Sequence, residues 1–104
     1  MSCIDKASIL RLQENGHPIV FIDVRSDEEF KIQHIEGSVH IPVNDIINFT
    51  KEMDKSLFYI TVCTMGGGRS DIAAAKLQTM GFVAQSLCGG VQNWDSESSS
   101  ISAG

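Results

Sequence analysis

The sequence lacks the long apolar runs of a membrane protein and the basic clusters of a nucleic-acid-binding protein. No apolar run approaches the roughly 20 residues that cross a bilayer, and the opening residues, MSCIDKAS, have neither the basic nor the apolar region of a signal peptide. Thirteen acidic and eight basic residues give a formal net charge of −5, without a Lys/Arg cluster that could displace counterions from a phosphate backbone. We therefore expect a cytoplasmic protein that binds neither membranes nor nucleic acid.

Cysteine is also scarce, and its number is odd. Cys3, Cys63 and Cys88 are the three cysteines, and no two of them form a Cys-x-x-Cys pair. Disulfide scaffolds are typical of shorter secreted chains, whereas 104 residues are enough to fold without covalent links. We therefore predict neither a disulfide framework nor a zinc site.

The composition fits one globular domain of ordinary size. Hydrophobic residues make up 42% of the chain and charged residues 20%, which excludes a disordered chain. After Trp94 the sequence DSESSSISAG loses apolar periodicity. We predict a single domain over residues 1–94 and a solvated, mobile tail over residues 95–104.

Short apolar runs alternate with segments of helical periodicity. The runs IVFI and LFYITV are nearly unbroken and rich in β-branched and aromatic residues, as in strands buried on both faces of a parallel sheet. We predict strands over residues 19–22, 39–41, 57–62 and 83–87. We predict helices over residues 5–15, 44–53 with Asn44 as its cap, and 69–80. This alternation of strand and helix predicts an α/β fold.

The segment YITVCTMGGGRSDIAAA contains the residues best suited to chemistry. It places Cys63 at the carboxyl end of a buried strand, the edge where open α/β sheets bind ligands. The three following glycines let backbone N–H groups converge on an anion, and Arg69 and Ser70 open a helix whose N-terminus also favours negative charge. These donors should favour the thiolate of Cys63, which is the nucleophilic form.

Other readings of this segment are weaker. A lone cysteine after a strand is often a small, inert, buried residue, but the Gly-Gly-Gly-Arg-Ser continuation favours a nucleophile. A Walker phosphate-binding loop requires Gly-Lys-Ser/Thr, which is missing, and a dinucleotide fingerprint requires no cysteine at this place.

Several short motifs follow one another along the chain. A first block ends a strand and runs into the next, with the residues Asp23-Val24-Arg25, Glu29-Phe30, His34-Ile35, Gly37-Ser38 and His40-Ile41-Pro42. Cys63 with Arg69-Ser70 follows, and then come Gly89-Gly90-Val91 and Trp94. In this order and at these separations, the blocks resemble those of the single-domain rhodaneses, or sulfurtransferases, over most of the chain.

The resemblance implies a five-stranded parallel sheet between helices, and a Cys63 that cycles through a persulfide without a metal or organic cofactor. Thiosulfate or a persulfide would give its outer sulfur to Cys63, and cyanide, a thiol or a sulfur-carrier protein would accept it. We expect a monomer or weak dimer in which Cys63 and Arg69 are catalytic. The expected substrate-binding residues are Thr64, Met65, Gly66, Gly67, Gly68 and Ser70.

The loop departs from the rhodanese pattern in length and charge. Common rhodaneses place four residues between the cysteine and the last basic residue, whereas Thr64 to Gly68 make five. That length occurs in related phosphatases and arsenate reductases, so oxyanion chemistry is an alternative, as is a non-catalytic sulfur-relay module. Against a phosphatase, the residue directly before Cys63 is not a histidine, and the loop holds no acidic residue. Because the loop also lacks lysine, we expect loose binding of dianionic thiosulfate.

The remaining candidates have mainly structural interpretations. Cys88 either fills space at a tight turn or resolves an oxidised Cys63 through a disulfide, and Cys3 is expected to have no chemical role. Asp71, in the first helical turn, is expected to cap the helix or to be solvated. The residues expected to act through hydrogen bonds or packing are Asp23, Arg25, His34, His40 and Trp94.

Overall fold

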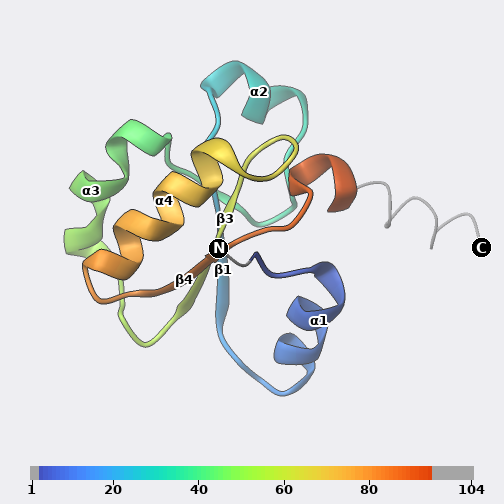
Figure 1. Cartoon of the computed structure of the whole chain (residues 1–104), viewed down its shortest axis with the longest axis vertical. Coiled ribbons are helices and arrows are strands. Elements are labelled where there is room, and N and C mark those ends of the chain that lie inside the picture. The colour runs from blue at the N-terminus through green and yellow to red at the C-terminus, as the bar shows by residue number, and fades with distance from the viewer. Residues whose placement is uncertain (1–2, 95–104) are drawn as a thin grey trace, which may run out of the picture.

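The computed structural model describes residues 3–94 and places a parallel sheet between helices (Figure 1). The strands are β1 (Ile19–Asp23), β2 (Val39–His40), β3 (Phe58–Val62) and β4 (Val83–Ser86). They pair in parallel in the order β2-β1-β3-β4, which puts β1 and β3 at the centre. The two most apolar predicted strands are therefore the two that have neighbours on both sides, and the α/β prediction is confirmed.

The expected fifth strand is reduced to a single residue. Ile4 forms an isolated parallel bridge with Leu87, in which the Ile4 N–H donates to the Ser86 carbonyl at 2.8 Å and the Cys88 N–H to the Ile4 carbonyl at 2.9 Å. The next residue, Asp5, already caps a helix, because its side chain accepts from the Ser8 N–H at 2.8 Å. The prediction of five strands was wrong within residues 3–94, since the chain turns into this helix after one residue of pairing.

The helices that flank the sheet in the described part of the chain include α1 (Lys6–Glu14), α2 (Asp27–Ile32), α3 (Ile46–Phe49) and α4 (Gly68–Thr79), and residues 90–94 are also helical. Of these, α1 and α4 were predicted within a residue or two. The helix predicted over residues 44–53 is instead three pieces, with α3 between the 3₁₀ turns η1 (Val43–Asp45) and η2 (Thr50–Glu52). Asn44 lies inside η1 and does not cap α3.

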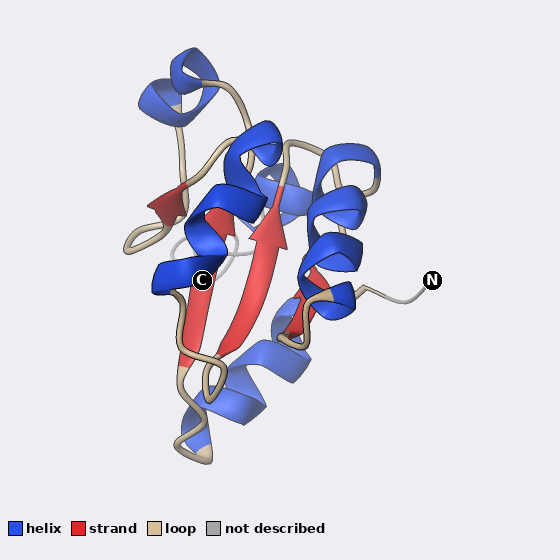
Figure 2. Cartoon of the chain, turned by 90° about the vertical axis from the view of Figure 1, so that its left-hand side faces the viewer, coloured by secondary structure: helices blue, strands red, loops and turns tan. Residues whose placement is uncertain are grey.

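The two faces of the sheet carry separate apolar clusters, with helices on both sides in Figure 2. Ile22 and Tyr59 pack with Ile46 of α3 and Leu77 of α4. On the opposite face, strand residues pack with Ile9 of α1 and with a short helical turn over residues 90–94. Trp94 packs edge-on against the Phe21 ring at 5.3 Å between centroids, as predicted. Within residues 3–94, no helix is long and apolar enough to span a bilayer.

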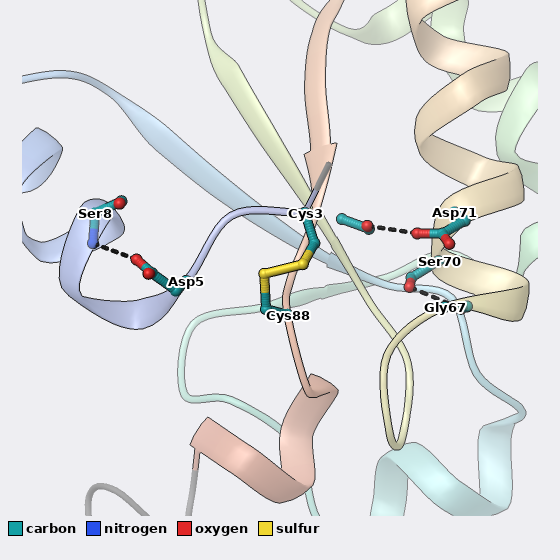
Figure 3. Close-up of a disulfide and its surroundings, with 8 residues drawn as sticks. Cys3, Asp5, Ser8, Gly67, Ser70, Asp71 and Cys88 are labelled. Carbon is teal, nitrogen blue, oxygen red and sulfur yellow. Dashed lines mark hydrogen bonds between the residues drawn. A yellow bond between two sulfur atoms is a disulfide. The ribbon is translucent and has the colours of Figure 1, made fainter. Parts of the chain in front are cut away.

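A disulfide joins Cys3 to Cys88, beside the Ile4 bridge (Figure 3). The predictions that the chain has no structural disulfide and that Cys3 has no chemical role were therefore wrong. Cys88 is paired with Cys3 and not with Cys63, which is a free, buried cysteine. An odd number of cysteines requires one unpaired residue but does not exclude a pair among the others.

Breaking the Cys3–Cys88 bond is expected to lower the free energy of unfolding by about 2–4 kcal/mol, because a long closed loop restricts the unfolded chain. The bond joins residues 85 positions apart. Urea unfolding of the oxidised protein, with and without dithiothreitol, measures this difference. Cys3→Ser should match the reduced protein and respond no further to reductant. Identical midpoints for the oxidised and reduced proteins would contradict a stabilising bond.

Candidate active site

Cys63 directly follows β3, the strand between β1 and β4, and so lies at the carboxyl edge of the sheet centre. The side chain is only 5% exposed. The loop that follows leads into α4 at Gly68 and lies between α2 and the turn over residues 90–94 (Figure 1). The predicted nucleophile is thus held at the edge where parallel sheets bind ligands.

The three glycines of the loop all adopt left-handed backbone conformations. Their φ angles are 86° at Gly66, 72° at Gly67 and 47° at Gly68. Residues with a Cβ rarely adopt such angles, so the tight turn that brings the loop back over Cys63 depends on glycine.

The group that the loop turns toward the sulfur is a carbonyl. Cys63 Sγ donates to the Gly67 oxygen at 3.1 Å, and the same oxygen accepts from the Ser70 N–H at 3.1 Å. The sequence predicted a concavity of N–H donors, which suits an anion. The conformation described here suits the protonated thiol, because an S–H group can donate to a carbonyl and a thiolate cannot.

Ser70 supplies the polar side chain nearest the sulfur. It is fully buried, its hydroxyl lies 3.2 Å from Cys63 Sγ, and it donates to the Gly67 carbonyl at 3.0 Å (Figure 3). The Thr61 hydroxyl of β3 donates to the Ser70 carbonyl at 2.7 Å and holds the first turn of α4 against the sheet. Because a hydroxyl proton rotates freely, Ser70 can donate to the sulfur once Cys63 is ionised.

Ser70→Ala is expected to lower kcat/KM for any reaction of the Cys63 thiolate by about 10- to 150-fold, since a hydrogen bond to a charged group contributes about 1.5–3 kcal/mol. The rate of Cys63 alkylation by iodoacetamide as a function of pH would show the cause. At a fixed pH near neutrality, alkylation should be slower in Ser70→Ala than in the wild-type protein, because the thiolate loses a hydrogen-bond donor. An unchanged alkylation profile would show that Ser70 does not stabilise the thiolate.

The Gly89-Gly90 turn lies directly against the loop backbone. The Val91 N–H donates to the Cys63 carbonyl at 2.9 Å, and the Gln92 N–H to the Thr64 carbonyl at 3.1 Å. A Cβ on Gly90 would lie 2.3 Å from the Cys63 oxygen, closer than real Cβ atoms approach. The terminal Gly-Gly motif therefore holds the peptide of Cys63 in place.

The Arg69 side chain is paired with a carboxylate and is not a free cation beside the sulfur. Its Nη1 and Nη2 donate to the two carboxylate oxygens of Glu29 at 2.8 and 3.2 Å. These hydrogen bonds, chiefly, raise the pKa of Arg69, and a charged Cys63 would raise it further to a smaller extent. The guanidinium thus lies in the electrostatic field of the sulfur but is engaged by a residue of α2.

Glu29 belongs to the site, although it was not among the catalytic or binding residues predicted from the sequence. Its carboxylate also accepts from the Thr64 hydroxyl at 3.2 Å and from the Ser26 N–H and hydroxyl, both at 3.0 Å. The sequence carries a signal for this, because Ser26 and Glu29 have the spacing of a capping box. That signal predicts a helix at 27–32 with Glu29 in its first turn, near the edge where Cys63 lies.

The polar residues around the site play the structural roles predicted for them. The Arg25 guanidinium donates to the buried Asp23 carboxylate at 2.8 Å and also to the Gln33 carbonyl. A ring nitrogen of His34 lies 2.7 Å from the Phe30 carbonyl, and one of His40 lies 2.9 Å from the Arg25 carbonyl. Residues 3–94 contain no group of His, Cys, Asp and Glu side chains that could hold a metal ion.

The hydrogen bonding of Asp71 differs from what was predicted. This residue neither caps α4, whose N-terminus has no side-chain cap, nor is simply solvated, because it accepts from the Ser86 hydroxyl at 2.6 Å. Of the other predicted binding residues, Thr64 contacts Glu29, and Met65 is 69% exposed at the mouth of a surface pocket that it lines with Gly89. A Cβ on Gly66 would lie 2.8 Å from the Gly89 nitrogen, so a side chain there would collide with the Gly89 backbone.

Known proteins share this arrangement of strand, loop and helix. The chain is 32% identical over 88 residues to thiosulfate sulfurtransferase GlpE of Pseudomonas aeruginosa, covering 85% of this chain and 78% of that protein. It is 37% identical over 84 residues to thiosulfate sulfurtransferase GlpE of Pseudomonas syringae, covering 80% of this chain and 76% of that protein. The solved structure of a rhodanese-like domain protein from Staphylococcus aureus matches with a TM-score of 0.78 and 29% identity, covering 90% of this chain and 91% of that chain.

The match extends to the family as a whole. Residues 5–97 match the family model of the rhodanese-like domain, which takes in the sheet, the Cys63 loop and the Gly89-Gly90 turn. The order of the sequence blocks, the parallel sheet and the position of the buried cysteine all agree with that match. The chain therefore belongs to the family of rhodanese-like domains.

Proposed function

We propose that this protein is a sulfurtransferase that moves a sulfane sulfur from thiosulfate or a persulfide to cyanide or a thiol through a persulfide on Cys63. The observation that carries the proposal is the free, buried Cys63 at the carboxyl edge of the sheet, with the Ser70 hydroxyl 3.2 Å from its sulfur. The relatives named thiosulfate sulfurtransferase support the reaction class.

The first half-reaction transfers sulfur to the protein. The Cys63 thiolate attacks the outer sulfur of thiosulfate, the S–S bond of the donor breaks, and sulfite leaves with the bonding electron pair. The Cys63 persulfide anion that results carries the charge one atom further out. Ionisation of Cys63 removes the proton that it donates to Gly67, and the Ser70 hydroxyl then provides a donor for the anionic sulfur.

The second half-reaction discharges the persulfide. Cyanide or a thiolate attacks the outer sulfur, and the Cys63 thiolate is released as the leaving group, so the cysteine returns unchanged. The exposed Met65 and the surface pocket that it lines with Gln92 and Asn93 lie beside the loop and offer an approach for the acceptor. A sulfur-carrier protein as acceptor and a monomeric or weakly dimeric state are further predictions.

Steady-state assays with cyanide as acceptor test the proposal, run beside a phosphatase assay on an aryl phosphate and an arsenate-reduction assay. Formation of thiocyanate from a sulfane donor, dependent on Cys63, is the expected result. Hydrolysis of the phosphate or reduction of arsenate without any sulfur transfer would replace the proposal with oxyanion chemistry. Inactivity in all the assays would favour the non-catalytic module.

A further inference from the structure

We propose that Glu29 determines which sulfur donors the protein accepts: it occupies Arg69 as an internal anion, so that sulfane donors of low charge are preferred over dianionic thiosulfate. This inference rests on the proposed sulfur transfer and adds the class of donor. It identifies Glu29 as a specificity-determining residue that acts through Arg69.

The first support is the geometry of the pair. Both terminal nitrogens of the Arg69 guanidinium donate to Glu29, one to each carboxylate oxygen. This two-pronged arrangement is the one that an arginine would use to bind an oxyanion such as the sulfonate end of thiosulfate. An incoming dianion must therefore either displace Glu29 or bind without that edge of Arg69.

The second support is that Glu29 is held from several sides. Besides the two bonds from Arg69, its oxygens accept from the Ser26 N–H and hydroxyl and from the Thr64 hydroxyl. Moving the Glu29 side chain aside would break its half of the capping box of α2 as well as the ion pair. Both side chains of the pair are partly solvated, at 41% and 36% exposed, so the hydrogen bonds that surround the carboxylate matter as much as its charge.

The third support is the charge balance at the loop. The hydrogen bonds from Arg69, above all, hold the pKa of Glu29 well below its usual range, so Glu29 carries its negative charge at neutral pH. Arg69 is the only charged side chain from Thr64 to Ser70, and Glu29 neutralises it. A dianion thus meets no net positive charge at the loop and approaches a chain whose formal net charge is −5.

A matched pair of donors tests this directly. Benzenethiosulfonate is a monoanion and thiosulfate a dianion, and both give a sulfane sulfur to a cysteine thiolate. Glu29→Gln removes the negative charge and keeps a side chain of the same size. We expect kcat/KM for thiosulfate to rise about tenfold in Glu29→Gln, mainly through KM, because an unscreened charge near the donor changes affinity by about that much. The value for benzenethiosulfonate should change by less than about threefold.

Ser26→Ala is the control for a merely structural effect. It breaks the capping box of α2 and keeps the Glu29 charge, so it should lower stability by about a factor of five in the folding equilibrium. The thiosulfate-to-benzenethiosulfonate ratio should shift much less than in Glu29→Gln, because Arg69 and Thr64 still hold the carboxylate. If Ser26→Ala shifts the ratio as far as Glu29→Gln does, the charge of Glu29 is not the cause.

The wild-type protein provides a second readout that does not depend on whether a variant folds. With Arg69 neutralised, raising the ionic strength from about 20 to about 200 mM should raise kcat/KM for thiosulfate relative to benzenethiosulfonate, because salt screens repulsion by the acidic chain. A relative fall in kcat/KM for thiosulfate would show an unpaired cation at the site and overturn the inference.

Transfer from both donors with an unchanged ratio in Glu29→Gln would also overturn the inference and leave the sulfurtransferase proposal standing. Transfer from neither donor would remove that proposal itself.

Discussion

Cys63→Ser is expected to abolish sulfur transfer, with kcat/KM falling by at least about a thousandfold, the scale on which enzymes lose activity with their nucleophile. A serine hydroxyl does not ionise near neutral pH and does not form the sulfur–sulfur bond of a persulfide. The fold should be retained, because serine is close in size to the 5% exposed cysteine and its hydroxyl can donate to the Gly67 carbonyl. Thiocyanate formation and circular dichroism measure the two effects.

The control for this variant removes the other two cysteines. The double variant Cys3→Ser, Cys88→Ser lacks the disulfide and keeps Cys63, so it should retain sulfur transfer at a temperature where it is folded. Activity that survived in Cys63→Ser and disappeared in the double variant would move the nucleophile away from Cys63 and contradict the proposed mechanism.

Gly90→Ala is expected to damage both the fold and the site. The new methyl group would lie 2.3 Å from the Cys63 oxygen and 2.6 Å from the Thr64 oxygen, at a position where φ is +63°. Overpacking and left-handed strain together cost about 2–5 kcal/mol. Relief of the clash would displace the Cys63-Thr64 peptide, and a displacement of about 1 Å at a nucleophile can lower the rate about a hundredfold. Urea unfolding and steady-state kinetics measure the two losses.

Gly16→Ala separates strain from collision. Gly16 has a similarly positive φ of +82°, and a Cβ there would meet nothing within 4 Å. This variant should lose only about 1–2 kcal/mol of stability and no activity per folded molecule. Equal losses for Gly16→Ala and Gly90→Ala would show that the contact of Gly90 with the loop has no special role.

The central strands and the longest helices were predictable because their signals are local. The apolar runs of β1 and β3 and the periodicity of α4 each lie within one segment, and the position of Cys63 after β3 follows from them. The break of the 44–53 helix into three pieces was not apparent from apolar spacing. Its hydrophobic residues keep a helical order although the backbone tightens into 3₁₀ turns at both ends.

The contacts missed from the sequence join distant segments. The Glu29–Arg69 pair links residues 40 positions apart, and the Cys3–Cys88 bond links residues 85 apart. The orientation of the Gly67 carbonyl was missed for a different reason, since three consecutive glycines allow many conformations and the sequence does not choose among them. Composition and spacing therefore located the candidate nucleophile Cys63 at the carboxyl edge of the sheet, but not Glu29, the residue that pairs with Arg69.

Mass spectrometry of the intact protein after incubation with a sulfane donor tests the central claim most directly. We predict an increment of about 32 Da, the mass of one sulfur atom, as expected for a persulfide. Digestion should place the added sulfur on the peptide that contains Cys63, and addition of cyanide should remove it with release of thiocyanate. A protein that turns over sulfane donors without this increment, or that carries it equally in Cys63→Ser, would contradict a Cys63 persulfide.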